Sequence, residues 1–442
     1  MAEFAPGIRS KTDYGDLRTL PTNQLIDYVA QAHNALRAGK HIDLRFGTPD
    51  GLFSWALPKG LPEPGKNALA VRTQLHDYGY KDFQGRIAQG YGAGTVDTAD
   101  KGRVIIEKAS PWAIKFIVAH HKHPSYYTMF RPKGMNEWLI RNTTPVKEEI
   151  LDTYQKEHLK SYSPEAAGSL LTDDTISSAK IDGAAAIIAL LANKAQVYSY
   201  VKDKLGRPIV HTERIGELSN LNIPKALQGY MLRGEIYGEH KGKAIPAQEL
   251  SGILNSSLEN ALLKKQQQDI NLKVALFNIL KGKGDEGLAP ADKMERLKTI
   301  ISQLSLGDKM IVPEYASGAA ASKELLSRIL SGKHPLTSEG IIAYTNRGPV
   351  KIKGTQDSDV IIKNIFQAEL QDGEPRAGGF EYTLPNGSEV VGKVGTGFSH
   401  ATLRDMLQNP QDYIGRTARI KSFGQYPSGA YRAPVFISRH EG

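Results

Sequence analysis

The chain has 442 residues, of which 40% are hydrophobic and 23% charged, values typical of a globular protein with two to four domains. It contains no cysteine, which excludes disulfides, thiolate zinc sites and cysteine nucleophiles. A formal net charge of +9 suits a polyanionic partner, although diffuse surface basicity would give the same value. No apolar run is long enough to span a membrane and the first residues lack the features of a signal peptide, so we expect an intracellular protein, cytoplasmic or nucleoid-associated.

An alternating strand at residues 41–46 is the first segment with chemical content. His41, Asp43 and Arg45 project from one face of this strand, and three apolar side chains project from the other. Imidazole and carboxylate groups are common metal ligands, and a guanidinium binds phosphate oxygens. The pattern predicts a phosphoryl site in which His41 and Asp43 hold a metal ion. His33 follows Leu25 and Val29 at helical spacing, which indicates a helix with His33 packed on its apolar face.

Residues 31–142 resemble the 3′-phosphoesterase module of the bacterial end-joining DNA ligase. The matching segments are Gln31-Ala32-His33-Asn34-Ala35, His41-Ile42-Asp43-Leu44-Arg45, Ser54-Trp55-Ala56-Leu57-Pro58-Lys59-Gly60, His76 to Tyr80, Phe83-Gln84-Gly85 and Tyr91-Gly92-Ala93-Gly94. The resemblance implies a β-rich domain. Three features depart from that family. The interval from His33 to His41 is longer, which predicts a misplaced third metal ligand, Asn67-Ala68 replaces a basic pair, and Gln74 replaces an acidic residue.

Two functions therefore stay open for this module. It is either an active 3′-phosphoesterase or a scaffold that binds DNA, and we prefer the second interpretation. Basic and aromatic side chains between residues 103 and 141 favour DNA binding. They are Lys108, Lys115, His120, His121, Lys122, His123, Arg131, Lys133 and Arg141, with Tyr126, Tyr127 and Phe130 among them.

Lys180-Ile181-Asp182-Gly183 begins an ordered series of charged motifs. A Lys-x-Asp-Gly match alone arises by chance in roughly one chain in ten of this length. The motifs that follow are Leu232-Arg233-Gly234-Glu235-Ile236-Tyr237, Val274-Ala275-Leu276-Phe277, Ser338-Glu339-Gly340-Ile341 and Val350-Lys351-Ile352-Lys353. Each motif alone is typical of ordinary surface or core structure, but the ordered set predicts a nucleotidyl-transfer site.

The residue types suit attack by Lys180 on the α-phosphate of a nucleotide. An attacking lysine must be neutral, and nearby cations such as Lys351 and Lys353 would favour loss of its proton. Alternation with apolar residues places these two lysines on one face of a strand, and Arg233 and Glu235 share a strand face in the same way. Carboxylates near phosphate oxygens are what Mg²⁺ needs.

The motif order resembles that of the ATP-dependent DNA ligases, within the superfamily of lysine-adenylate ligases and mRNA-capping enzymes. The resemblance implies that ATP is the nucleotide, that Lys180 is the nucleophile and that Asp182 holds the 3′-terminal nucleotide or a metal in later steps. The implied nucleotide and metal contacts are Arg233 with the nucleotide, Glu235 with the ribose or the metal, Phe277 with the adenine, Glu339 with the metal, and Lys351 and Lys353 with the α-phosphate. The metal would be Mg²⁺, with Mn²⁺ as an alternative.

Two departures from the ligase pattern leave open how the phosphate at a break is held. Ala184-Ala185-Ala186 occupies a run where many DNA ligases have an arginine. Ser199-Tyr200 stands where the family has Ser-Arg. Neither change removes the groups that adenylation needs.

From about residue 367 the chain alternates short strands with turns, and a helix is predicted from Ser399 to Gln408. Five or so strands and one helix in roughly 75 residues suit a small Greek-key barrel of the OB type. Residues 393–399 and 431–436 resemble the ligase OB domain, although Arg439-His440-Glu441-Gly442 replaces its usual ending. Arg432 and Arg439 are candidates for orienting the pyrophosphate of ATP.

These inferences predict an α+β multidomain protein with a β-rich phosphoesterase-like domain at residues 1–144 that binds DNA. A nucleotidyltransferase (adenylation) domain of antiparallel sheets with flanking helices would follow at 145–365, and an OB-fold β-barrel at 366–442. A polar connector is expected at 146–160. We expect a monomeric ATP-dependent DNA ligase that acts on nicks or ends of duplex DNA, without a membrane partner. The alternatives are a bifunctional 3′-end-healing phosphoesterase and ligase, an RNA ligase or capping guanylyltransferase, and a non-catalytic DNA-end binding protein.

Overall fold

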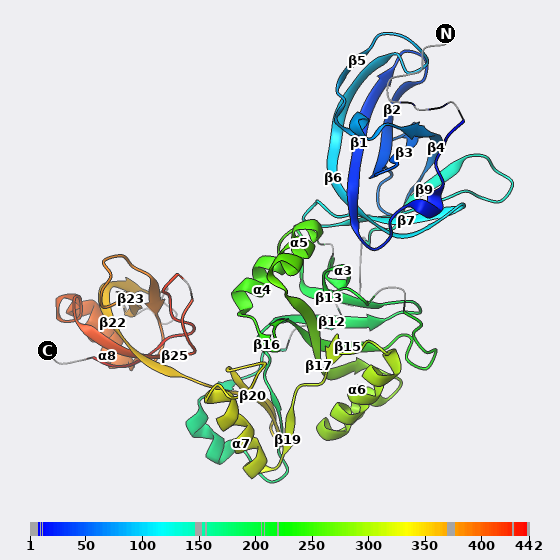
Figure 1. Ribbon diagram of the computed structural model, residues 1–442. Coiled ribbons are helices and arrows are strands. Elements are labelled where there is room, and N and C mark those ends of the chain that lie inside the picture. Colours follow the sequence, from blue (N-terminus) through cyan, green and yellow to red (C-terminus); the bar gives the residue numbers. More distant parts are fainter. Residues whose placement is uncertain are drawn as a thin grey trace. The chain divides into compact units, whose positions relative to one another are not determined.

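The computed structural model describes residues 8, 10, 12–145, 153–154, 157–204, 206, 208–218, 221–368, 376–426 and 428–439 (Figure 1). The chain forms two compact units, one with residues 1–157 and 182–312 and the other with residues 158–181 and 313–442. Most of the connector predicted at residues 146–160, and the last three residues of the chain, lie outside the described residues. Within the described ranges, no helix is long and apolar enough to cross a membrane.

The first unit begins with an antiparallel barrel, in agreement with the β-rich N-terminal domain that the sequence predicts. Its sheet has nine strands in the order β1-β2-β3-β4-β9-β8-β7-β6-β5, and pairing of β1 with β6 closes all of them except β5 into a ring. The strands are β1 (Leu25–Ala35), β2 (Gly39–Thr48), β3 (Gly51–Leu57), β4 (Asn67–His76), β5 (Gly85–Ile87), β6 (Gly94–Ser110), β7 (Ala113–Val118), β8 (Ser125–Phe130) and β9 (Trp138–Asn142). Two short 3₁₀ helices, η1 (Leu17–Thr19) and η2 (Tyr78–Asp82), accompany the barrel.

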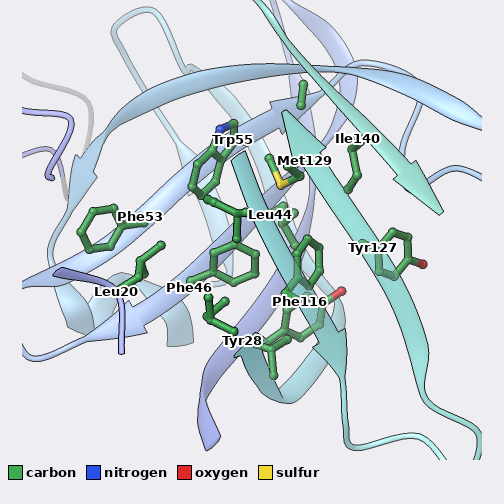
Figure 2. Packing of buried hydrophobic residues seen from close by; sticks show 14 of the residues in the cluster. Leu20, Tyr28, Leu44, Phe46, Phe53, Trp55, Phe116, Tyr127, Met129 and Ile140 are labelled. Atoms are coloured by element: carbon green, nitrogen blue, oxygen red, sulfur yellow. The ribbon is translucent and has the colours of Figure 1, made fainter. Parts of the chain in front are cut away.

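Apolar side chains from these strands form the core of the barrel (Figure 2). Phe46 is fully buried, and its ring packs against Trp55 and Phe116 at centroid distances of 5.6 and 4.9 Å. Burial of each such side chain contributes about 1.5–3 kcal/mol relative to its exposure. Because side chains alternate along a strand, Asp43 and Arg45 lie on the other face of β2, as predicted.

The prediction of a helix around His33 was wrong, because these residues form strand β1. Positions 25, 29 and 33 are four residues apart, an interval that satisfies the two-residue period of a strand as well as the period of a helix. β1 pairs with β2 on one side and with β6 on the other. Backbone hydrogen bonding across the barrel therefore outweighs the local helical pattern.

A second antiparallel sheet completes the first unit, with the order β14-β13-β12-β15-β17-β18 and β16 paired to β15. Its strands are β12 (Ala184–Leu190), β13 (Ala195–Lys202), β14 (Pro208–Val210), β15 (Met231–His240), β16 (Lys243–Ala244), β17 (Asn271–Lys281) and β18 (Met310–Ile311). The helices of this region are α3 (Thr212–Ile215), α4 (Ala247–Leu254), α5 (Leu258–Gln268), η4 (Asp285–Gly287) and α6 (Pro290–Leu304). α6 begins with Pro290 at a position where no backbone donor is needed, and it buries one apolar face.

The second unit contains a five-stranded sheet with the order β10-β21-β20-β11-β19. Its strands are β10 (Ser161–Tyr162), β11 (Ile176–Ala179), β19 (Tyr315–Ser317), β20 (Gly340–Thr345) and β21 (Gly348–Lys353). Helices η3 (Pro164–Ala166), α2 (Ala167–Leu170) and α7 (Ala319–Leu330) belong to the same region. Leu325, Leu326 and Ile329 of α7 pack with Ile341 and Ile352 of the sheet in one core, which fixes the strand ends discussed below.

The C-terminal part of this unit is another five-stranded antiparallel sheet, with the order β24-β23-β22-β25-β26. It comprises β22 (Gln356–Gln367), β23 (Ala377–Thr383), β24 (Gly392–Val394), β25 (Thr417–Ser422) and β26 (Val435–Arg439), with α8 (His400–Gln408) and η5 (Pro410–Asp412). The predicted C-terminal helix is α8, and Ser399 caps it by accepting a hydrogen bond from the backbone N–H of Thr402. The domain boundary predicted at residue 365 falls inside β22.

Candidate active sites

Lys180 lies directly after β11, where the ends of neighbouring strands meet. Its backbone N–H donates to the carbonyl of Gly340 at 2.9 Å, and its own carbonyl accepts a hydrogen bond from Thr337 Oγ1 at 2.6 Å. Gly340 lies opposite Lys353 in the pairing of β20 with β21. These contacts place Lys180, Glu339 and Lys353 at the same edge of the sheet.

The Glu339 carboxylate joins two lysines. Lys180 Nζ contacts one carboxylate oxygen and Lys353 Nζ contacts the other. The side chains of Lys180 and Glu339 are only 16% and 13% exposed. Burial alone would raise the pKa of the Glu339 carboxyl, but the two ammonium groups lower it below its usual value. Two cations and one anion leave a net positive charge, which suits a polyphosphate ligand.

Strand β21 alternates as predicted. Val350 and Ile352 are buried in the core with α7, whereas Lys351 and Lys353 are half-buried and lie on the other face. The backbone N–H of Lys351 donates to the carbonyl of Lys160 at 2.8 Å, which fixes β21 beside β10. The structure therefore brings Lys353 into contact with the Lys180 cluster and places Lys351 on the same strand face.

Gly183 is required by the close approach of a neighbouring strand in the first unit. A Cβ atom at this position would lie 2.1 Å from the carbonyl oxygen of Ile236 and 2.9 Å from the side chain of Glu235. No rotamer change relieves a clash with a backbone carbonyl. The glycine of the Lys-x-Asp-Gly sequence thus lets the chain after Asp182 enter β12 alongside β15.

Arg233 and Glu235 share one face of β15, as their alternation predicts, because the register with β12 is continuous there. Arg233 is 7% exposed, its Nε donates to the Tyr200 hydroxyl at 2.9 Å, and its guanidinium pairs with Glu157. Sequence analysis gave no role to Tyr200, which stands where the ligase family has an arginine. In the structure it anchors Arg233.

Phe277 lies at a β-bulge in β17. Arg233 is opposite Asn278 and Gly234 is opposite Leu276, so Phe277 is the additional residue between them. The side chain of Phe277 is half-buried, whereas Leu276 before it is buried. The bulge moves Phe277 out of the regular alternation of β17 and leaves part of its ring accessible, which a stacking role requires.

The two C-terminal arginines occupy different settings. Arg432 lies between β25 and β26, where its backbone N–H donates to the Gly424 carbonyl at 2.8 Å and its guanidinium is 5.8 Å from the ring centroid of Tyr426. The guanidinium of Arg439 lies 4.6 Å from the Tyr413 ring and donates to the carbonyl of Asp412 at 3.1 Å. Arg439 is thus engaged within its own sheet, and the role of Arg432 with pyrophosphate stays a prediction.

The barrel carries a second cluster, in which His33, His41 and Asp43 offer ligand atoms close enough to hold one metal ion. His33 lies directly opposite His41 in the pairing of β1 with β2, so their separation along the sequence does not keep them apart. His33 Nδ1 is 3.3 Å from Asp43 Oδ2, and His41 Nε2 is 3.6 Å from Asp43 Oδ1. The prediction that His33 is misplaced as a ligand was therefore wrong.

The other ring nitrogens of these histidines are held by backbone carbonyls. His33 Nε2 is 2.8 Å from the Gly92 oxygen, and His41 Nδ1 is 2.9 Å from the Gly39 oxygen. A carbonyl can only accept, so each ring donates there and presents its remaining nitrogen toward Asp43. Metal-binding histidines are oriented by such contacts. The residues therefore fit a divalent metal ion of the kind that imidazole and carboxylate ligands bind.

Arg45 supports the cluster from its buried side. It is 2% exposed and donates to Asp43 at 2.9 Å, to Gln31 at 2.7 Å and to Ser54 at 2.9 Å. Its guanidinium also lies 5.0 Å from the ring centroid of Tyr80. Each guanidinium nitrogen thus has a protein partner. Arg45 holds Asp43 in place, and its predicted role as a phosphate contact is secondary to this one.

The charges of the cluster favour an ionised Asp43. Burial alone would raise the pKa of the Asp43 carboxyl, but Arg45 and the histidines lower it overall. The hydrogen bond to Asp43 raises the pKa of His33. Burial, together with Arg45, lowers the pKa of His76 to about 3, so this ring is neutral at pH 7. Sequence analysis quoted His76 only within a matching segment, and the structure places it 5.3 Å from the Tyr80 ring beside the cluster.

Comparisons with known proteins agree with these features. Residues 31–131 match the family model of the DNA ligase D 3′-phosphoesterase domain. The multifunctional non-homologous end joining DNA repair protein LigD of Mycobacterium tuberculosis is 27% identical over 402 residues, which cover 86% of this chain and 49% of that protein. LigD of Pseudomonas aeruginosa is 44% identical over 80 residues, 18% of this chain and 9% of that protein.

A solved structure of a Lig E DNA ligase matches with a TM-score of 0.43 and 16% identity, and covers 65% of this chain and 99% of that one. The chain spans about half the length of the mycobacterial relatives. The resemblance predicted from the sequence is confirmed: the N-terminal domain is similar to the DNA ligase D 3′-phosphoesterase domain, and most of the chain is similar to end-joining LigD proteins.

Proposed function

We propose that the chain is an ATP-dependent DNA ligase that joins 5′-phosphate and 3′-hydroxyl ends of duplex DNA through a covalent Lys180–AMP intermediate. The observation that carries this proposal is the cluster in which Glu339 is held between Lys180 and Lys353. A lysine beside a carboxylate and a second cation has the groups that nucleotidyl transfer needs. The curated relatives bear the names of end-joining proteins, which supports DNA as the substrate.

In the first step Lys180 Nζ attacks the α-phosphorus of ATP, so that a nitrogen–phosphorus bond forms and the bond to pyrophosphate breaks. An ammonium group paired with a carboxylate is not a nucleophile. Lys180 must therefore lose its proton and leave Glu339 before attack. Because Lys353 contacts the other carboxylate oxygen, Glu339 keeps a partner while Lys180 moves to the phosphate.

The remaining nucleotide contacts that we propose are those that the resemblance of the motifs to DNA ligases implies. Lys351 and Lys353 would contact the α-phosphate, Phe277 would stack on the adenine, Arg233 would contact the nucleotide, and Arg432 would orient the pyrophosphate. Glu339 and Glu235 would hold Mg²⁺, or Mn²⁺ in its place. The anionic, partly accessible Glu339 oxygens fit such an ion, which when bound would neutralise phosphate charge.

Two further displacements at phosphorus complete the reaction. A 5′-phosphate oxygen attacks the phosphorus of Lys180–AMP and releases the lysine, and the 3′-hydroxyl then attacks the 5′-phosphorus and releases AMP. Asp182 would hold the 3′-terminal nucleotide or the metal in these steps. We propose three domains for this work, at residues 1–144, 145–365 and 366–442, the last of them an OB-fold barrel, in a monomeric protein.

DNA binding by the N-terminal domain is supported by a row of exposed cations on the barrel. Lys108 of β6 lies opposite Lys115 of β7, Lys115 lies opposite Thr128 of β8, and Thr128 lies opposite Arg141 of β9. Directly opposed like charges destabilise a sheet, so the pairing of two exposed lysines favours a polyanionic ligand. We call Lys108, Lys115 and Arg141 the basic row.

Two aromatic residues predicted to take part in DNA binding are not available for stacking. Tyr127 is buried in the barrel core, and the Tyr126 hydroxyl donates to Glu213 at 2.7 Å. Trp112 is instead 57% exposed and lies 4.4 Å from the Arg131 guanidinium. Contact with DNA through this domain would therefore depend on phosphate neutralisation more than on base stacking.

Alanine replacement of Lys108, Lys115 and Arg141 tests the basic row. We expect weaker binding to nicked duplex DNA, and a slope of log affinity against log salt that is about 2–3 units shallower. Self-adenylation should not change. A variant with alanine at the exposed Arg37, Lys40 and Lys59 has the same change in charge and is the matched control. Equal slopes in the two variants would show that the row does not contact phosphate.

A 3′-phosphoesterase activity is the second candidate function, and the geometry of His33, His41 and Asp43 favours it. When bound there, a divalent metal would polarise a phosphoryl oxygen. Asn67, Ala68 and Gln74 lack the charges that the family has at these positions, and this argues against the activity. Release of phosphate from a 3′-phosphorylated primer in the presence of Mn²⁺ would establish it, provided that Asp43→Asn abolishes the release.

The ligase proposal is tested by incubating the protein with radiolabelled ATP and then adding a nicked duplex. We expect label that stays on the protein after denaturation, that transfers to the 5′-phosphate, and that leaves as AMP when the nick is sealed. A nicked duplex with RNA at the break separates a DNA ligase from an RNA ligase. Failure to form a covalent adenylate would overturn the proposal.

A further inference from the structure

A second group of possible metal ligands lies elsewhere on the barrel, at Asp100 of β6 and at His120 and His121 in the segment after β7. Both imidazole rings direct Nε2 to the same carboxylate oxygen, Asp100 Oδ1, at 2.8 Å for His120 and 3.3 Å for His121. Tetrahedral zinc with bonds of about 2.0–2.2 Å separates its ligand atoms by roughly 3.3–3.6 Å. The His121 contact matches this separation, and the His120 contact would lengthen by about 0.5 Å on metal binding.

The orientation of His120 is fixed by its surroundings. Its Nδ1 faces the carbonyl oxygen of Arg103 at 3.4 Å, which can only accept a hydrogen bond. With the ring proton on Nδ1, the Nε2 lone pair points at the Asp100 oxygen, an arrangement that a metal ion bound to both atoms satisfies. A Cβ at residue 102 would lie 2.2 Å from His120 Cγ, so Gly102 provides the space for this ring. His33, in the cluster with His41 and Asp43, is held in the same way, by a carbonyl on one nitrogen and a carboxylate on the other.

A buried tyrosine hydroxyl lies beside this group. Tyr28 is 2% exposed, its ring is 5.5 Å from that of His120, and its hydroxyl faces the Asp100 carboxylate. Its buried hydroxyl adds a polar group beside the two imidazoles and the carboxylate.

We propose that Asp100, His120 and His121 bind a divalent transition metal ion of the zinc class, with a water molecule as the fourth ligand. The site is separate from the His33, His41 and Asp43 cluster. It needs neutral imidazole ligands and one carboxylate, a set that zinc and cobalt both accept. His121 is 50% exposed, so the ion can enter from solvent.

The position of the site indicates a structural role. The carbonyl of Ala119 accepts a hydrogen bond from the backbone N–H of Glu259 in α5 at 2.9 Å, and the carbonyl of Lys122 accepts one from Arg214 at 3.3 Å. Ala119 and Ile117 also pack against Leu258. The metal would therefore order residues 119–124, the loop between β7 and β8 that packs against α3 and α5.

Metal content of the full chain tests the proposal. Protein without an affinity tag is stripped with a chelator, loaded with Zn²⁺, and analysed for bound metal. We expect about two equivalents in the native chain, about one in His121→Ala or Asp100→Asn, about one in His41→Ala, and none in the variant that combines His41→Ala with His121→Ala. His123→Ala, in the same segment but outside the group, is the matched control and should keep both equivalents. Circular dichroism checks that each variant is folded.

Two readouts locate the metal. Co²⁺ should give a visible absorption band in His41→Ala that disappears when His121 is also replaced. Metal should slow amide exchange of residues 119–124 on the order of tenfold in His41→Ala but not in His121→Ala. A native chain that binds no metal, or one equivalent that is lost in His41→Ala and kept in His121→Ala, would overturn the proposal. The group would then be an ion pair between Asp100 and a protonated His120.

Discussion

The Lys180 cluster and the His33 cluster each contain a carboxylate that contacts basic side chains. They differ in how tightly that carboxylate is held. Asp43 is bound on one side by Arg45, whose other nitrogens are committed to Gln31 and Ser54. The Glu339 carboxylate contacts two flexible lysine side chains, which can move without breaking a network. The first arrangement suits a metal ligand that must stay in place, and the second suits a nucleophile that must leave its partner during the reaction.

The two regions also differ in net charge. The Lys180 cluster has two cations and one anion. In the His33 cluster the positive charge of Arg45 offsets the negative charge of Asp43, so the net charge is that of the two histidines. A polyphosphate is therefore attracted to the first cluster in the absence of a metal ion. The second cluster becomes a phosphate site only if its metal is bound. This contrast predicts large catalytic effects from substitutions in the Lys180 cluster. Substitutions in the His33 cluster should mainly affect stability or metal binding.

The largest effect is expected for Lys180→Ala. Without the amine no nitrogen–phosphorus bond can form, so covalent adenylate should fall by at least about 10³-fold while affinity for nicked DNA stays nearly unchanged. The measurement is label retained on the protein after denaturation. Lys180→Arg keeps a cation next to Glu339 and is the control for charge. Label retained on either variant would show that another residue is the nucleophile.

Glu339→Gln should lower the rate of self-adenylation by about 10²-fold, a smaller loss than removal of the nucleophile. The amide leaves two ammonium groups without their shared anion and binds a metal ion less well. Single-turnover adenylation at several Mg²⁺ concentrations would show the loss together with a higher metal requirement. Glu324→Gln removes an exposed carboxylate from α7 and should have no effect. Equal rates for the two variants would remove Glu339 from the site.

Arg45→Met tests the rigid cluster and should lower the free energy of unfolding of the barrel by about 3 kcal/mol, because it leaves Asp43 buried without its cation. All three tryptophans of the chain, Trp55, Trp112 and Trp138, belong to this domain, so their fluorescence during urea unfolding reports on it. Arg37→Met, at an exposed position, is the control. A loss under about 1 kcal/mol would show that Arg45 does not stabilise Asp43.

The loss of stability caused by Arg45→Met should depend on pH. The pKa of Asp43 is lowered in the folded protein, so its contribution to stability is present above the unfolded value near 3.8 and is lost as the pH falls through the lower folded value. In Arg45→Met, protonation of Asp43 relieves the unpaired charge. The stability difference between the native chain and the variant should therefore narrow on acidification below pH 4.

The sequence predicted those parts of the sites that depend on a single strand. The alternation of Lys351 with Val350 and Ile352 required only a period of two residues, and it is found in β21. Sequence analysis failed where the geometry depends on pairing between strands. The opposition of His33 to His41 and the bulge at Phe277 arise from register, which no local pattern contains.

Tertiary contacts explain the other residues that sequence analysis missed. Tyr200 anchors Arg233 from a different strand, and the motif at Tyr200 was noted only for the arginine it lacks. Tyr126 was expected to stack on DNA because it lies among basic residues. Its hydroxyl instead donates to Glu213, at a position 87 residues further along the chain. The burial of such a residue depends on a partner segment that the local sequence does not reveal.

The smallest effect is expected for His41→Ala, which should change the rate of nick sealing by less than about twofold. The reason is that His41 lies opposite His33, near the end of β1 that is far from Leu25. The contacts of the barrel with α3 and α5 involve Leu25, Arg103, Ile105, Ile117 and residues between 119 and 126. No step of sealing needs a metal at His41. If the domain is an active phosphoesterase, the same variant should lose release of 3′-phosphate with Mn²⁺ while sealing of a 3′-hydroxyl nick continues. A large sealing defect in a stably folded His41→Ala protein would contradict the separation of the two clusters, and it would require the barrel to transmit the state of its metal site to the ligase reaction.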